Sequence, residues 1–251
     1  MRIDLYLTQN GFCKSRSKAV AAIEEKRVLL AGKPVTKASL DVSGNEPIEV
    51  LPEENGFVSR AGKKLEAALQ AFGLDVSGTT VVDLGASTGG FTDCVLRRGA
   101  SFVYAVDVGS GQLDGSLRED ERVRNMENTN ARYLKKSDFD KPVDLIVTDV
   151  SFISQRLLYP AVADILEDGK PFVSLIKPQF EVGKAHVGKN GIVRDPDGKL
   201  FRKVVSELKE EAAKHGLLLK QTIDSPIPGG DGNKEYLALW IRGSAESDKK
   251  I

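Results

Sequence analysis

The sequence of 251 residues has no apolar run that approaches the roughly 20 residues a helix needs to cross a bilayer. Its N-terminal stretch, MRIDLYLTQNG, lacks the apolar segment of a secretory signal. Two cysteines, Cys13 and Cys94, and two histidines, His186 and His215, are too few for a disulfide framework or a metal cluster. We therefore expect a protein of the reducing cytoplasm that needs neither a metal nor a membrane.

An excess of one charge sign is also missing, because 36 Lys and Arg residues balance 36 Asp and Glu residues. The balance is uneven along the chain: residues 1–40 hold eight bases and three acids, and residues 41–55 hold five acids and no base. A basic N-terminal surface suits a phosphate backbone, although a solvated helix face would have the same composition. The candidate contacts to such a backbone are Arg2, Lys14, Arg16, Lys18 and Arg60.

The first part of the chain, residues 1–58, has the pattern of a small α+β domain. The stretch SRSKAVAAIEEK predicts a helix with Ser15 as its N-cap and with Ala19 and Ile23 at helical spacing. Short extended runs, separated by glycine turns, follow this helix: RVLLAG, KPVTKAS and PIEVL. The polar stretch PEENG at 52–56 is typical of a linker.

From residue 59 to residue 243 the pattern changes to alternating helices and strands, beginning with an amphipathic helix. Apolar runs rich in β-branched residues predict strands at 80–84, 102–107, 143–149 and 171–176, with two later strands at 217–224 and 235–243. Helices are predicted at 63–72, 91–98, 153–166 and 199–216. Repeated β-α units indicate a Rossmann-like, doubly wound and mostly parallel sheet, while the tail at 244–251 is expected to be disordered.

The stretch VVDLGASTGGF places a glycine turn directly after the first of these strands, where open parallel sheets bind ligands. The dinucleotide fingerprint G-x-G-x-x-G is absent, because Ser87 stands where its second glycine would approach a pyrophosphate. No G-x-x-x-x-G-K-[ST] phosphate loop is present either. An adenosine ligand without a phosphate, S-adenosylmethionine, therefore fits better than a nucleotide.

That ligand also needs an acid at the end of the next strand to hold its ribose hydroxyls, and Asp107 ends FVYAVD at the expected distance from Gly85. A glycine turn that only permits close packing is the alternative interpretation. The candidate cofactor contacts are Asp83, Gly85, Ala86, Ser87, Gly89, Gly90, Phe91, Asp107, Val108 and Asp149.

Four charged residues stand at predicted strand ends or in the first helix of the sheet domain: Lys64, Asp149, Lys177 and Glu235. A lysine at the end of a buried strand is costly unless it is paired, and Asp149 is a natural partner for Lys177. Beside a methyl donor, such a set can remove or steer the proton of a hydroxyl, with Lys64 as a second cation. Ordinary ion pairs at strand ends would have the same composition.

These motifs, in this order, resemble the TlyA family of S-adenosylmethionine-dependent rRNA methyltransferases, which also carries the older label hemolysin A. The stretches that carry the resemblance are VSRAGKKLEAAL, DLGASTGGFTDCVL, AVDVGSGQL, DLIVTDVSFIS, LIKPQFEVGK, GIVRD and GNKEYL. Residues 59–243 look like the FtsJ/RrmJ group of RNA 2′-O-ribose methyltransferases. The first 50 residues look like the RNA-binding module named after ribosomal protein S4, with Lys26 and Ala31 in place of the usual glycine and asparagine.

The resemblance implies that Lys64, Asp149, Lys177 and Glu235 form a catalytic tetrad with Lys177 at its centre. It implies that Asp83, Gly85 and Asp107 belong to the cofactor site, and Asp138 in KSDFD is a further candidate for contact with adenine. The implied substrate is the ribose 2′-hydroxyl of cytidine in the rRNA of ribosomal subunits. The basic N-terminal domain would then attract that RNA.

Three other functions remain as alternatives at this point. A membrane-damaging hemolysin is disfavoured by the lack of a spanning segment and of a secretion signal. An RNA-binding protein without catalysis would not need the tetrad or the glycine turn. A pseudouridine synthase can carry the same N-terminal module, but it needs a different catalytic domain, in which the glycine turn has no place.

Overall fold

The computed structural model describes residues 1–13, 15–44, 46–51, 56–183, 186–188, 190–195, 197–229 and 232–243. The chain separates into two compact units, Met1–Arg60 and Ala61–Ile251. The sequence-based boundary between residues 58 and 59 lies two residues before this division. The linker residues 52–55 and the tail at 244–251, for which disorder was predicted, fall outside the described residues.

The N-terminal unit contains two helices and a small antiparallel sheet with strand order β2-β1-β3. Its elements are α1 (Ile3–Gln9), α2 (Arg16–Glu24), β1 (Val28–Leu30), β2 (Lys33–Pro34) and β3 (Ile48–Val50). As predicted, Ser15 caps α2, because its side chain accepts a hydrogen bond from the Lys18 backbone N–H. Ile3, Leu7 and Ile23 are among the side chains of the two helices that pack into the unit's own core.

The two residues that replace the usual glycine and asparagine of the S4-type module both adopt the left-handed backbone conformation. The φ angle of Lys26 is 58° and that of Ala31 is 48°. The turns before and after β1 therefore keep a conformation that glycine or asparagine adopts more easily.

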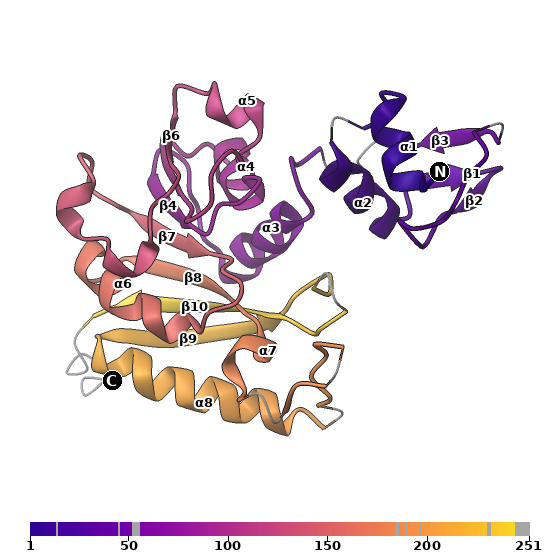
Figure 1. Cartoon of the computed structure of the whole chain (residues 1–251). Helices are drawn as coiled ribbons and strands as arrows, with labels where there is room; N and C mark the ends of the chain where they lie inside the picture. The colour runs from indigo at the N-terminus through magenta and orange to yellow at the C-terminus, as the bar shows by residue number, and fades with distance from the viewer. Residues whose placement is uncertain are drawn as a thin grey trace. The chain divides into compact units, whose positions relative to one another are not determined.

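The larger unit is built on a seven-stranded sheet, counted over the described residues, with helices on both of its faces (Figure 1). The strands are β4 (Thr80–Leu84), β5 (Phe102–Val106), β6 (Val123–Met126), β7 (Leu145–Thr148), β8 (Pro171–Ile176), β9 (Leu217–Asp224) and β10 (Tyr236–Arg242). The α-helices are α3 (Ala61–Phe72), α4 (Gly90–Arg97), α5 (Gly115–Arg118), α6 (Tyr159–Ile165), α7 (Pro178–Glu181) and α8 (Lys199–Lys214). Short 3₁₀ helices are η1 (Ala131–Tyr133), η2 (Lys136–Asp138) and η3 (Gln155–Leu158).

The strand order is β6-β5-β4-β7-β8-β10-β9. Strands β4 to β8 pair in parallel, whereas β10 is antiparallel to both β8 and β9. The sheet is therefore doubly wound, with the order reversing beside β4, as the β-α pattern of the sequence predicts. The carboxyl end of β4, which carries the glycine turn, lies at this reversal, where open sheets bind their ligands.

The central strands are buried along their whole length and mostly apolar, because both of their faces are covered. Every residue of β4 and β7 is buried. The largest fully buried side chains include Trp240, Tyr104 and Tyr159. Over the described residues, no helix combines the length and the apolar character needed to cross a membrane.

Candidate active site

The glycine turn after β4 has the tight backbone that its sequence predicts. Gly85 and Gly89 have φ angles of 85° and 93°, which favour glycine. A Cβ atom at Gly85 would lie 3.0 Å from Val150 Cγ1, and one at Gly89 would overlap the side chain of Leu117. Ser87, which replaces the second glycine of the dinucleotide fingerprint, also has a positive φ of 48°. The turn therefore keeps a glycine-like shape although a hydroxymethyl group occupies it.

The carboxylate of Asp107, just beyond β5, is held in one orientation by two backbone N–H groups. Ser87 N donates to Asp107 Oδ2 at 2.8 Å, and Gly109 N donates to Asp107 Oδ1 at 2.7 Å. The neighbouring Val108 is 73% exposed. The turn and the acid of the next strand thus meet at one edge of the sheet, which is the arrangement that a ribose with two free hydroxyls requires.

Asp83, near the end of β4, is fully buried, and only one of its two carboxyl oxygens accepts hydrogen bonds from described residues. Its Oδ2 accepts hydrogen bonds from the backbone N–H of Thr92 at 3.0 Å and from Thr92 Oγ1 at 2.7 Å. Its Oδ1 is buried and accepts no hydrogen bond from any described residue. Burial, with a smaller contribution from the nearby charges of Asp149 and Asp107, raises the pKa of Asp83 from 3.8 to about 7. Such a group is suited to a ligand that brings positive charge or a hydrogen-bond donor.

The other candidates from the turn lie where the chain enters α4. Ala86 is buried, and Ala86 N donates to the carbonyl of Val106. Gly90 and Phe91 are buried in the first turn of α4. The side chain of Phe91 therefore belongs to the core of the unit.

Asp138 is not brought to this edge by any recorded contact. It is exposed in η2, and its Oδ2 accepts a hydrogen bond from the Lys135 backbone N–H at 2.8 Å. Lys136 in the same turn binds Asp164 of α6 and Glu167, which follows α6. The structure thus gives Asp138 a local role in its own turn, and contact with adenine remains only a prediction.

The four charged residues of the expected tetrad form two ion pairs. Lys177, directly after β8, has its Nζ 2.5 Å from Asp149 Oδ1 and donates a hydrogen bond to Ser151 Oγ at 2.8 Å. Asp149 and Ser151 both follow β7. The ion pair between strand ends that the sequence predicts for Lys177 is therefore present.

The second pair is almost completely enclosed. Lys64 Nζ of α3 donates to Glu235 Oε2 at 2.6 Å, and the two side chains are only 6% and 3% exposed. Gly229 leaves the space for this carboxylate, because a Cβ atom there would lie 2.5 Å from Glu235 Oε1. Removing one partner of so deep a pair leaves a buried charge unpaired, at a cost of about 3–5 kcal/mol.

The sheet register brings the two pairs to the same edge. Tyr236 of β10 pairs with Ile176 of β8, so the next residues in this antiparallel register, Glu235 and Lys177, come opposite each other. In the parallel pairing of β7 with β8, Thr148 pairs with Ser174, and continuing that register sets Ser151 level with Lys177. The reversal of direction at β10 therefore unites residues that lie far apart in the sequence.

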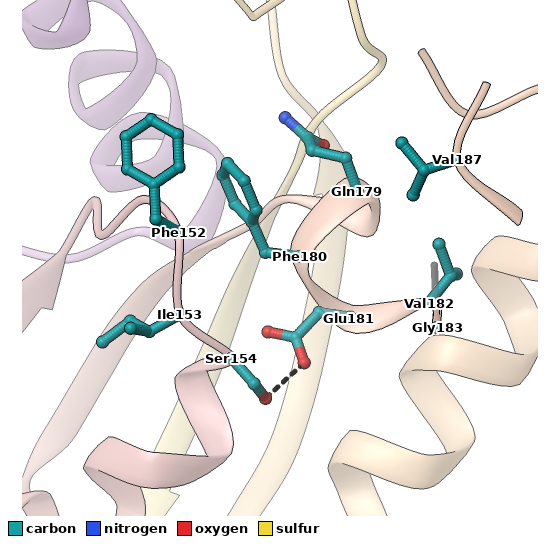
Figure 2. Close-up of a pocket in the computed structure, with 9 residues that line it drawn as sticks. All are labelled: Phe152, Ile153, Ser154, Gln179, Phe180, Glu181, Val182, Gly183 and Val187. Carbon is teal, nitrogen blue, oxygen red and sulfur yellow. Dashed lines mark hydrogen bonds between the residues drawn. The ribbon is translucent and has the colours of Figure 1, made fainter. Parts of the chain in front are cut away.

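An open pocket of about 570 Å³ is lined by residues 152–154, which follow β7, by residues 179–183, and by Val187. Figure 2 shows the rings of Phe152 and Phe180 side by side at this pocket, with the centroids 5.4 Å apart. Phe152 is 89% exposed and has a positive φ of 66°. Figure 2 also shows the hydrogen bond that joins Ser154 to Glu181.

Sequence reasoning did not single out Ser151, Phe152 or Glu181. The signals that could have done so are the position of DVSFIS directly after a strand that ends in a charged residue, and the large apolar side chain that this loop contains.

The predicted RNA contacts in the N-terminal unit are all held by other groups where the structure describes them. Arg2 Nη2 and Arg16 Nε both lie beside Asp4 Oδ2, at 3.0 Å and 2.8 Å. Asp4 is fully buried, and the hydrogen bond from Arg2 is the main cause that lowers its pKa to about 2. Both guanidinium groups remain about half exposed, so Asp4 orients them without covering them.

The remaining candidates in this unit are bound within it or are not described. Lys18 Nζ donates to the carbonyl of Val58, and Arg60 Nη1 pairs with Glu24 Oε2 at 3.1 Å. Lys14 lies outside the described residues.

The fold and the site together define an α/β methyltransferase with a separate N-terminal unit. Residues 57–242 match the FtsJ-like methyltransferase family, and residues 1–48 match the S4 domain. The 16S/23S rRNA (cytidine-2′-O)-methyltransferase TlyA of Mycobacterium tuberculosis is 43% identical to the chain, over 96% of this chain and 89% of that protein. The chain therefore belongs to the FtsJ-like methyltransferase family, in the group that includes TlyA.

Two solved structures are similar to the chain. A protein of Streptococcus thermophilus, provisionally named a hemolysin, is 40% identical with a TM-score of 0.78, over 97% of this chain and 88% of that one. An S-adenosylmethionine-dependent methyltransferase of Mesorhizobium loti has a TM-score of 0.51 at 17% identity, over 70% of this chain and 96% of that one. The second similarity concerns the fold alone.

Proposed function

We propose that the protein methylates the ribose 2′-hydroxyl of cytidine in rRNA within ribosomal subunits, using S-adenosylmethionine. The observation that carries this proposal is the meeting of two ion pairs, Lys177–Asp149 and Lys64–Glu235, at the sheet edge that also holds the glycine turn. A relative with 43% identity bears the name of such an enzyme. The S4 domain and its basic residues supply the contact with RNA.

The residues at this edge fit S-adenosylmethionine. The fixed carboxylate of Asp107 suits two ribose hydroxyls, and the unpaired Asp83 Oδ1 suits a cationic ligand. Gly85 and Gly89 let the turn pack closely against Val150 and Leu117, which a Cβ atom at either position would approach too closely. When bound, S-adenosylmethionine supplies a methyl group already activated by a sulfonium. The protein then has to align two reactants and manage one proton.

Lys177 is the residue we assign to the reacting hydroxyl. Its Nζ steers the ribose oxygen, and the proton that this oxygen loses passes to the Lys177–Asp149 pair. Ser151 and Asp149 fix the position of Nζ by their contacts at 2.8 Å and 2.5 Å. The pair Lys64–Glu235 holds a second positive charge at the same edge, and the exposed ring of Phe152 offers a stacking surface to a nucleotide in the pocket.

The test uses labelled S-adenosylmethionine with small and large ribosomal subunits from a strain that lacks the gene. Label in 2′-O-methylcytidine, identified after digestion of the rRNA, would establish the reaction and show which subunit is modified. Absence of label from both subunits, with cofactor binding shown separately by calorimetry, would contradict the proposal and favour RNA binding without catalysis.

The variant Lys177→Ala tests the role of the lysine in the same assay. We expect it to lose turnover by at least about 100-fold while it binds S-adenosylmethionine as the wild type does, because Lys177 acts on the hydroxyl and not on the cofactor. Near-normal turnover by this variant would show that the tetrad is assigned wrongly.

A further inference from the structure

The segment that follows β7 holds a strained backbone beside the proposed catalytic lysine. Phe152 has a φ of 66°, which is unusual and unfavourable for a bulky side chain. Its neighbour Ser151 accepts the hydrogen bond of Lys177 Nζ. Regular structure resumes only with η3 at Gln155. Contacts from outside this segment must therefore hold it in its conformation.

Glu181 supplies those contacts from the last position of α7. Its Oε2 accepts a hydrogen bond from Ser154 Oγ at 2.6 Å, and its Oε1 accepts one from the Gln155 backbone N–H at 2.8 Å. Lys177 directly precedes α7 and Glu181 ends it, so one short helix separates the lysine from the residue that fastens the facing segment. Two hydrogen bonds, Lys177 to Ser151 and Ser154 to Glu181, join these two stretches of chain. Together with the backbone of residues 151–154 and 177–181, they form a closed ring.

The burial of this carboxylate is costly, which argues for a specific task. The Glu181 side chain is only 3% exposed, and the sole cation recorded beside it among the described residues, Arg156, lies 3.7 Å away. Burial raises the pKa of Glu181 despite its two hydrogen bonds. Taking an ionised carboxylate out of water is unfavourable, and apolar residues of the same volume are often equally stabilising.

We propose that Glu181 is a positioning residue for methyl transfer: by fastening the segment 151–155 to α7, it keeps Ser151 and Asp149 against Lys177 Nζ. This inference rests on the proposed function, because it needs Lys177 to act on the hydroxyl. Glu181 itself lies on the far side of this ring of contacts and acts through Ser151.

The test compares Glu181→Ala, Glu181→Gln and the wild type in the methylation of ribosomal subunits, with turnover normalised to the S-adenosylmethionine sites counted by calorimetry. We expect Glu181→Ala to lower kcat by about 10- to 100-fold, with less than about 3-fold change in KM for the subunits, because a small misplacement of Lys177 affects the chemical step. Glu181→Gln keeps an acceptor oxygen and should recover part of the loss.

Glu207→Ala is the matched control. Glu207 Oε2 binds the same Arg156 at 2.9 Å but makes no recorded contact with residues 151–155, so kcat should stay within about 2-fold of the wild type. A double-mutant cycle separates positioning from loss of stability: in a Ser151→Ala background, Glu181→Ala should cost much less than in the wild type.

Equal turnover per cofactor site in Glu181→Ala and the wild type would overturn the inference, as would a full effect of Glu181→Ala in the Ser151→Ala background. If Glu181→Ala does not fold, Ser154→Ala carries the same test, since it removes one of the two hydrogen bonds. Failure of the wild type to methylate either subunit would instead overturn the proposed function, so the two failures are distinguishable.

Discussion

The buried carboxyl group of Asp83 makes the stability of the protein depend on pH. Its pKa rises from 3.8 in the unfolded chain to about 7 in the folded chain, chiefly because burial penalises the charged form. Below pH 3.8 the group is protonated in both states and has no effect. As the pH rises through the window from 3.8 to about 7, the unfolded chain releases the proton first, so the free energy of unfolding falls.

The size of this effect follows from the difference between the two pKa values. One pKa unit corresponds to about 1.4 kcal/mol, so the ionised carboxylate lowers the free energy of unfolding by at most about 4 kcal/mol above pH 7. Asp83→Asn removes the titration and keeps an oxygen for the two hydrogen bonds from Thr92. The stability difference between Asp83→Asn and the wild type should therefore grow by about 2–3 kcal/mol between pH 5 and pH 8.

Urea unfolding of both proteins at intervals across that range measures the difference directly. Titrating groups that do not interact with Asp83 cancel in the comparison, because the two chains differ at one residue. A difference that stays constant with pH would refute the reasoning. A cationic cofactor near Asp83 adds a second measurement: its binding should tighten as the pH rises through 7 and should release a proton, which calorimetry detects in buffers of different ionisation enthalpy.

Three further predictions concern the tetrad and the basic surface. Lys64→Met alone should destabilise the protein by about 3–5 kcal/mol in urea unfolding, whereas Lys64→Met with Glu235→Leu should recover most of this stability and still lack methyl transfer. Gly229→Ala should reduce turnover by displacing the Glu235 carboxylate, whereas Gly115→Ala, where a Cβ meets no atom within 4 Å, should not. Arg16→Ala should weaken rRNA binding most at low salt and lower the slope of log K against log salt by about 1; an unchanged slope would exclude a phosphate contact.

The sequence was sufficient to locate most strands of the sheet, because buried parallel strands are continuous apolar runs. It did not indicate β6, whose sequence VRNM at the edge of the sheet has two exposed residues and no apolar run. It also did not indicate α1, where the N-cap position, Arg2, makes no side-chain capping bond. β6 has no apolar run to mark it as a strand. In α1, Ile3 and Leu7 are buried, but a helix of seven residues with no capping side chain is too short for these two positions to establish a helical period.

Which site residues form ion pairs with one another was harder to predict than which residues belong to the site. Asp149 and Lys177 end neighbouring strands of a βαβ unit, so their pairing follows from the sequence pattern. The pairing of Lys64 with Glu235 depends on β10 inserting antiparallel between β8 and β9, which no local pattern specifies. Glu181 was missed for a related reason. The stretch KPQFEVGK has the composition of a surface turn, and only the fold shows that Glu181 accepts a hydrogen bond from η3.

The charges of the proposed tetrad would account for a second set of RNA contacts. Its two lysines and two carboxylates are neutral together, and Asp107 lies at the same edge, so we expect this edge to accept an uncharged hydroxyl without binding a phosphate tightly in its place. The attraction for an RNA backbone has to come from elsewhere in the chain, and residues 1–40 carry the excess of bases. It follows that replacing both Lys64 and Glu235 by uncharged residues, as in Lys64→Met with Glu235→Leu, should leave the salt dependence of rRNA binding unchanged. A flatter salt dependence in that double variant would mean that the catalytic edge itself binds phosphate.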